Sequence, residues 1–229
     1  FTLRNNPVDL TLWKYLWNSS GTGALSPDSS LSFTYSFNLN GTEYYQHMRG
    51  CRPTSGTLSV SRGMWDQNMT FICKDITIPT TSTSDPGTPV YQSAETSSSP
   101  VVHSDGGGSP FTYNSISYGE RSFSTTVNRN MAVMAVNGET DITYTKATDR
   151  AITFTADVFS GTASSETALY TLYESKDADA ASYKFTSAGT VTLTYANCVI
   201  TDYAYTHAAG QADALIESIT CRAESCTNV

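Results

Sequence analysis

Residues 189–222 read GTVTLTYANCVITDYAYTHAAGQADALIESITCR, and residues 41–74 follow the same plan in GTEYYQHMRGCRPTSGTLSVSRGMWDQNMTFICK. Each copy opens on Gly-Thr, reaches a Cys, crosses a glycine-containing turn and closes on a second Cys. The Cys spacing is 73 − 51 = 22 residues in one copy and 221 − 198 = 23 in the other. Because an internal repeat fixes how many units a fold contains, the sequence predicts two related units in one chain.

The bulk composition limits the partners that the protein can have. Only 15% of the 229 residues are charged, and 13 basic and 21 acidic side chains give a net charge of −8. An acidic surface repels the phosphate backbone that nucleic-acid-binding proteins neutralise with Lys and Arg. No run approaches the ~18 apolar residues of a membrane span, and no basic-then-apolar leader opens the chain. We therefore expect a soluble mature protein that does not grip nucleic acid.

Helical periodicity occurs at one place in each unit. In the first unit, Asn6 and Pro7 supply a cap and a first helical residue. In the second, residues 165–174 read SETALYTLYE, with a serine cap and an acidic residue in the first turn. The residues expected to face inward are Leu10, Trp13 and Trp17 in the first helix and Leu169, Leu172 and Tyr173 in the second.

Most of the remaining sequence alternates polar and apolar residues with a period of two, which predicts half-buried strands. The clearest run is Leu31 to Leu39. The other predicted strands are residues 43–52, 57–61, 67–78, 115–118, 122–128, 140–146, 151–158, 183–186, 190–195, 199–205 and 212–222. The predicted fold class is mainly β, with two tandem β-sandwich or barrel-like domains, each with one flanking α-helix.

Residues 79–110 interrupt this pattern with five prolines, a Gly triplet and many Ser and Thr residues. Such a composition is typical of a linker or an extended arm. The predicted organisation is a first domain at 1–80, a Pro/Gly/Ser-rich linker or docking arm at 81–108, and a second domain at 109–229. The strands that precede the helix of the second unit have no counterpart in the first. Either further residues lie upstream of Phe1, which is the interpretation we favour, or the first unit borrows strands from elsewhere.

Some apolar residues have no evident place on the buried face of a strand. Two apolar islands interrupt the linker, and a purely flexible tether would not need them, so they indicate an arm that docks on its own domain or on a neighbouring subunit. Residues 130–136, NMAVMAV, are apolar on both parities and predict a buried strand or a surface that another subunit covers. The candidate subunit-interface residues are Val90, Tyr91, Val101, Val102, Met131, Val133, Met134 and Val136.

The cysteines are too few for a disulfide scaffold. If a glycine turn closes each hairpin, Cys51 faces Cys73, and Cys198 faces Cys221, across neighbouring antiparallel strands. Two interpretations remain open: two cross-strand disulfides, or buried free thiols, which a reducing compartment favours. Cys226 has no partner in either case.

No constellation of residues predicts catalysis or a cofactor. His47, His103 and His207 are far apart and lack the spacing of metal ligands. Asp177 and Asp179 share one loop, but the downstream bidentate Glu of a calcium loop is missing. We expect no catalytic residue, no metal and no cofactor, and hence no enzyme.

Four segments together resemble the tail tube (major tail) proteins of long-tailed phages. They are a helix followed by GTxxxxxxxGC (41–51), SPFTYNSISYGERSFSTTVNRNMAVMAVNG (109–138), LYTLYES (169–175), and NCVITDYAYTHAAGQADALIESITCRAE (197–224). The resemblance runs from Ser109 to Glu224 in the second unit and from the helix to Ile78 in the first. The sequence departs from the family at its start, where upstream strands are absent.

This resemblance implies β-sandwich or barrel-like domains that polymerise into stacked rings around a channel for DNA. Two fused domains imply rings of three subunits with pseudo-sixfold symmetry. The implied location is the virion tail, assembled in the host cytoplasm, and the implied partners are further copies of the chain, a tape measure protein, a tail terminator and baseplate or tip proteins. DNA would pass without specific binding, along a wall whose candidate lumen-facing acids are Asp202, Asp213 and Glu217.

Two other functions fit a β-rich chain. In a secreted carbohydrate-binding or adhesive β-sandwich, exposed tyrosines would stack on sugars; the candidates are Tyr44, Tyr45, Tyr203 and Tyr205. A tail terminator would form one ring and stop.

Overall fold

Antiparallel strands make up most of the chain in a computed structural model, which describes residues 1–5, 12–13, 16, 30–61, 64–81, 111–135, 142–159, 168–184, 192–207 and 215–228. The prediction of a mainly β fold is therefore confirmed. The elements are β1 (Thr2–Asn5), β2 (Leu31–Leu39), β3 (Thr42–Ser61), β4 (Met64–Ile72), β5 (Asp75–Ile76), β6 (Phe111–Tyr113), β7 (Ile116–Ala135), β8 (Ile142–Phe159), α2 (Ala168–Ser175), β9 (Asp179–Lys184), β10 (Thr192–His207), β11 (Leu215–Ala223) and β12 (Ser225–Asn228).

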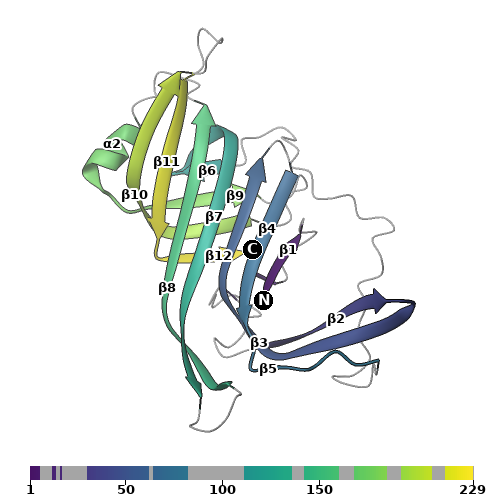
Figure 1. Ribbon diagram of the computed structural model, residues 1–229. Coiled ribbons are helices and arrows are strands. Elements are labelled where there is room, and N and C mark those ends of the chain that lie inside the picture. The colour runs from purple at the N-terminus through teal and green to yellow at the C-terminus, as the bar shows by residue number, and fades with distance from the viewer. Residues whose placement is uncertain are drawn as a thin grey trace.

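The strands of the second unit close into a barrel. The pairings run in the order β7, β6, β9, β10, β11 and β8, and β8 pairs with β7 again. β7 and β10 are long enough to pair with different neighbours along their lengths, which lets six strands complete the ring (Figure 1). β12 also pairs with β10, and α2 lies against β10.

Alternate residues of the barrel strands fill its interior with aromatic rings. On β8 the inward residues Ile152, Phe154, Ala156 and Val158 are all buried, while their neighbours are partly or fully exposed. The rings of Phe123 and Tyr183 stack at 4.0 Å, and those of Phe154 and Tyr195 lie 4.8 Å apart. Each fully buried large side chain contributes about 1.5–3 kcal/mol, so these rings are the main source of the barrel's stability.

The first unit extends the sheet of the barrel. β3 pairs with β7 over residues 55–61, β4 pairs with β3, and β1 pairs with β4. The rings of Trp65 in β4 and Tyr183 in the barrel pack in an edge-to-face arrangement, with their centroids 5.4 Å apart. Both residues belong to one continuous cluster of buried residues. Residues 82–110, which contain most of the predicted linker, lie outside the described residues.

The repeat seen in the sequence recurs as an order of strands. In each unit a long strand (β3, β10) forms a hairpin with the next strand (β4, β11). A short strand then returns to the first half of the long one: β5 pairs with β3 at Met48 and Arg49, and β12 pairs with β10 from Leu193 to Ala196. The units differ in the neighbours that complete them, because among the described residues only those of the second unit close into a barrel.

Two differences from the predicted elements have physical causes. Several predicted short strands are continuous in the structure, and five of them form parts of β7 and β8. Bulges between Glu120 and Ser122 and between Asn130 and Met131 change the parity of the inward residues, and in sequence such a change looks like the end of a strand. The helix expected at 165–174 is confirmed over the described part, as α2, with Leu169 buried. Of the helix expected near the N-terminus only residues 12, 13 and 16 are described, and there Leu16 N donates to Trp13 O at 2.9 Å.

Candidate assembly surfaces

A hairpin formed by β2 and the first half of β3, called the β2–β3 arm below, stands out from the body at the lower right of Figure 1. Its turn is Asn40-Gly41, with φ of 52° and 81°, the backbone of a two-residue hairpin turn that Asn-Gly favours. Asn38 Oδ1 accepts a hydrogen bond from Gly41 N at 2.9 Å. The tip is therefore a tight, well-defined turn.

The base of the β2–β3 arm is fixed by several contacts at one point. Gly50 has φ of 59° and breaks the line of β3 where the arm leaves the body. Next to it, Cys51 and Cys73 form a disulfide between neighbouring strands. Arg49 forms an ion pair with Asp75 at 3.7 Å on the other side of the bend. The direction of the arm is thus set by the covalent and polar contacts of this base.

Aromatic side chains follow one face of the β2–β3 arm. The rings of Tyr35 and Phe37 stack at 5.7 Å, and those of Phe37 and Tyr44 also at 5.7 Å. Tyr35 is 57% exposed and Leu39 55%. The alternation of β2 predicted that this face is half-buried, and for these two residues the prediction is wrong, because the arm leaves the body before its apolar face can be covered.

A second hairpin, called the β7–β8 arm below, extends beyond the barrel at the bottom of Figure 1. Within the described residues, β8 pairs with β11 from Ile152 to Phe159 and with β7 alone before that point. Val133 is 43% exposed and Met134 61%, whereas Met131 is partly buried. Of the two interpretations of residues 130–136, a fully buried strand is therefore wrong. The other candidate interface residues, Val136 and the four of the linker, lie outside the described residues.

The candidate lumen-facing acids have different environments. Asp202 is exposed on β10. Glu217 is fully buried and accepts a hydrogen bond from Tyr203 Oη at 2.9 Å, because it shares the inward parity of Ile219 and Cys221 on β11. Its carboxyl group therefore does not lie on the surface of the chain. Asp213 lies outside the described residues.

A second carboxyl group inside the barrel is that of Glu120, which no sequence pattern singled out. Glu120 and Glu217 both pair with Val158, one from each side, so all three side chains point inward. Burial raises the pKa of Glu120 to about 7, and the hydrogen bond that Tyr183 donates to it opposes this shift. Burial and the charge of Glu217 raise the pKa of Tyr118 to about 12. This end of the barrel holds two acids among tyrosines.

The remaining cysteines are buried thiols. Cys198, Cys221 and Cys226 are free, and burial raises the pKa of Cys198 to about 12 and the pKa values of the other two above their usual range. Cys221 lies opposite Ile200, not opposite Cys198, because the register of β10 and β11, with His207 opposite Leu215, places the midpoint of the hairpin beyond the midpoint of the two cysteines. These thiols are protonated and shielded, so they are unreactive.

The tyrosines proposed for sugar stacking do not gather in a cleft. Tyr45 is 6% exposed. Tyr203 lies against α2, with its ring 6.0 Å from that of Tyr173, and it binds Glu217. Tyr44 belongs to the ring stack of the β2–β3 arm, and Tyr205 is exposed. The carbohydrate-binding alternative therefore has no site among these four residues.

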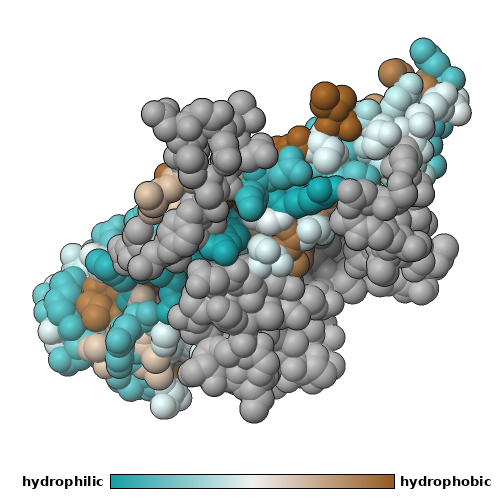
Figure 2. Space-filling view, turned by 90° about the horizontal axis from the view of Figure 1, so that it is seen from below, coloured by the Kyte–Doolittle hydropathy of each residue, from teal (hydrophilic) through white to brown (hydrophobic). Residues whose placement is uncertain are grey.

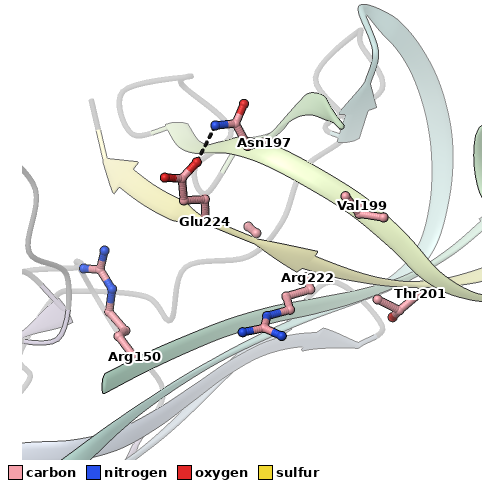
Figure 3. A pocket seen from close by; sticks show the side chains of 7 residues that line it. Arg150, Asn197, Val199, Thr201, Arg222 and Glu224 are labelled. Carbon is pink, nitrogen blue, oxygen red and sulfur yellow. Dashed lines mark hydrogen bonds between the residues drawn. The ribbon is translucent and has the colours of Figure 1, made fainter. Parts of the chain in front are cut away.

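A cavity of about 460 Å³ lies where β8 leaves the barrel (Figure 3). Arg150 and Arg222 project toward it, and Asn197 donates a hydrogen bond to Glu224 at its rim. Two arginines, an amide and a carboxylate arranged in this way lack a nucleophile with an adjacent base. In the described part of the chain, no group of three or more His, Cys, Asp or Glu side chains is close enough to hold a metal ion, and no helix has the length and apolar character needed to cross a membrane.

The described residues form a mainly antiparallel β protein that presents apolar hairpins on its surface. A family model described as "Phage tail tube protein" matches residues 6–223. The chain belongs to the phage tail tube protein family. Since this family is structural and non-enzymatic, the protein is a component of a virion tail and not an enzyme.

Other comparisons add little to this assignment. No curated protein matches the sequence. One solved structure that matches part of the chain is described as "Cryo-EM structure of the anti-feeding prophage (AFP) baseplate, 6-fold symmetrised". The match has a TM-score of 0.39 and 15% identity, and it covers 52% of this chain and 89% of that chain. The family assignment therefore rests on the sequence match.

Proposed function

We propose that copies of this chain assemble into stacked rings that form the tail tube, a channel through which DNA is ejected into the host. The observation that carries the proposal is the pair of arms, whose exposed apolar side chains no described part of the same chain covers. A ring forms when one surface of a subunit binds a different surface of the next and the rotation closes. Arms that project from the body are suited to such a contact.

The internal repeat supports rings of three subunits with pseudo-sixfold symmetry. Each unit carries a long strand, a hairpin partner and a short returning strand, so three chains supply six related hairpins. The two units then occupy alternate positions around the axis. The predicted first domain at 1–80 and second domain at 109–229 are the repeating parts in this arrangement.

The subunit interface that we propose uses the β7–β8 arm. Val133 and Met134 are exposed there, and burial of such side chains in an assembly contributes about 25 cal/mol per Å² of apolar surface. The remaining interface candidates are Met131, Val136 and the linker residues Val90, Tyr91, Val101 and Val102. Obligate interfaces commonly bury more than about 2,000 Å², which requires several such segments.

The channel function that we propose is passive. The net charge of −8 and the exposed position of Asp202 favour a wall that repels DNA over a Debye length of about 8–10 Å. Asp213 remains a candidate for the same wall. The proposed partners are the tape measure protein inside the tube, a tail terminator at one end and baseplate or tip proteins at the other, with assembly in the host cytoplasm.

Negative-stain microscopy of the purified protein over a range of concentrations tests the proposal. We expect hollow tubes of stacked rings. Single rings that never stack would instead identify a tail terminator. A protein that stays monomeric at every concentration would overturn the proposed assembly.

A further inference from the structure

One face of the β2–β3 arm carries only uncharged side chains. Residues paired across an antiparallel ladder share a face, and the register of β2 and β3 places aromatic and aliphatic residues of both strands together. The members of this surface, called the aromatic face below, are Phe33, Tyr35, Phe37, Leu39, Tyr44 and Met48. Thr42 and Gln46 complete the same rows, so none of the eight paired residues is charged.

The outer part of the aromatic face is open to solvent in the isolated chain, whereas Phe33 at its base packs against Phe1 and Phe71. Tyr35 and Leu39 are more than half exposed, and Ile76, opposite Met48, is 53% exposed. Figure 2 shows the arm projecting at the right, with apolar side chains between polar ones. Contiguous exposed apolar surface usually marks an interaction site.

The aromatic face is also ordered before it binds anything. Its rings already stack on one another, the Asn40-Gly41 turn fixes the tip, and the disulfide fixes the base. Binding therefore loses little side-chain and loop entropy, which is the main cost of association for flexible surfaces.

The family of the chain and its charge together favour a second copy as the occupant. Each chain carries a net charge of −8, so two copies repel one another unless they meet through surfaces without charge. The aromatic face is such a surface in a chain whose family builds virion tails. The other side of the same hairpin carries the charged residue Glu43 opposite Asn38, so that side is not an uncharged surface on which two copies could meet.

We propose that the aromatic face of the β2–β3 arm docks on a second copy of this chain, at a contact separate from that of the β7–β8 arm. The two arms leave the body in different directions (Figure 1), and stacked rings require two kinds of contact, one within a ring and one between rings. This inference rests on the proposed self-assembly and adds to it a second, named contact.

The first test compares wild type with a Tyr35→Glu/Leu39→Glu variant by sedimentation velocity and negative-stain microscopy. Two charges on the aromatic face should reduce the assembled fraction at least about tenfold, while the circular dichroism spectrum and melting temperature stay close to wild type, because both side chains are exposed. Ser36→Glu, an exposed position on the other side of the same strand, is the control and should assemble normally.

The outcomes separate this inference from the proposed function. If wild type forms tubes and the double variant forms them equally well, the docking inference is wrong and the tube proposal stands. If wild type itself does not assemble, both are wrong.

A second test identifies the occupant directly. A photo-cross-linking amino acid, p-benzoylphenylalanine, replaces Tyr35, and the assembled protein is irradiated. We expect covalent dimers whose cross-linked peptides come from two copies of the chain. Cross-links only within one chain, or none from protein that has assembled, would overturn the inference.

Discussion

Gly50 is the residue at which the β2–β3 arm departs from the body, and its backbone conformation is costly for any other residue. At φ of 59° a residue with a Cβ loses about 1–2 kcal/mol. A Cβ at this position would also lie 2.9 Å from Cβ of Lys74. We expect Gly50→Ala to lower the melting temperature by about 2–8 °C, measured by circular dichroism.

Gly41 provides the matched control for this substitution. Its φ is 81°, but no atom lies within 4 Å of the Cβ position. Gly41→Ala should therefore show the backbone cost without the collision, and its loss of stability should be the smaller of the two. Equal losses would mean that the contact with Lys74 does not constrain the bend.

Glu120 makes the stability of the protein depend on pH. Its pKa rises from 4.5 to about 7 on folding, so the folded state binds the proton more tightly than the unfolded state. The contribution of the protonated form is complete below pH about 4.5 and is lost as the pH rises toward 7. After allowance for partial solvent access, the loss amounts to about 1–3 kcal/mol.

A Glu120→Gln variant tests this dependence, since an amide oxygen can still accept the hydrogen bond from Tyr183. Urea unfolding at pH 5 and pH 8 should show a smaller fall in the free energy of unfolding for the variant than for wild type. The comparison cancels the titration of all other groups. The same pH dependence in both proteins would contradict the assigned role of Glu120.

At the level of single residues, the sequence indicated exposed apolar positions on the β7–β8 arm, but it did not indicate the acids inside the barrel. Met134 and Val133 were singled out because apolar residues occupied both parities, and both are exposed. Glu120 was missed, because the bulge between Glu120 and Ser122 changes which parity points inward. Glu217 was misplaced although it shares the parity of Ile219 and Cys221, because a carboxylate is normally expected to face solvent. A bulge depends on the register of the neighbouring strand, and that register is not written in the local sequence.

At the level of structural elements, the disulfide between Cys51 and Cys73 at the hairpin base stabilises the fold mainly by lowering the entropy of the unfolded chain. The bond closes a loop with a sequence separation of 22 residues, for which chain-entropy arguments give about 3 kcal/mol. We expect reductant to lower the melting temperature of wild type by several degrees, because a protein of this length loses about 2–4 °C for each kcal/mol of stability.

A Cys51→Ala/Cys73→Ala variant is the control for this measurement. It should melt at the same temperature with and without reductant, since its remaining cysteines are free thiols. If reductant changes wild type and the variant alike, the effect does not come from this bond. If it changes neither, the bond does not stabilise the folded chain.

Elements whose signal is local were predicted well. β2 has the predicted bounds, Leu31–Leu39, and α2 occupies most of its predicted range. The long strands were predicted in pieces, because a bulge such as that between Pro53 and Ser55 resembles a strand end in sequence. The burial of the β2 face was predicted from alternation alone, and alternation reports an apolar face without reporting whether the same chain covers it.

For the whole molecule, the charge of the exposed wall leads to a prediction about DNA passage. If Asp202 faces the lumen, Asp202→Lys in every subunit replaces repulsion by attraction along the channel. We expect genome ejection, followed by dye release or light scattering, to become slower, with the effect decreasing as salt is added. Ejection at the wild-type rate in tails that assemble normally would exclude Asp202 from the wall.

The repeat in the sequence predicts two units, but it does not predict how they connect. Two copies of one Cys-bounded hairpin indicated duplication, and both hairpins occur in the structure. Their fusion through β3 and β7 depends on pairing between segments that are far apart in the chain. Such long-range pairing leaves no local pattern, since β3 would alternate in the same way beside any partner.

The ladder between β3 and β7 has a mechanical consequence. β3 runs without interruption from one arm into the body, and β7 runs from the body into the other arm, with seven residue pairs joining them from Ser55 opposite Asn128 to Ser61 opposite Ser122. Because the two strands are antiparallel, both arms leave the ladder at the same end, beyond the pair of Ser55 and Asn128. Tension that separates the arms therefore loads the pairs one after another from that end, and the ladder yields more easily than one pulled from opposite ends.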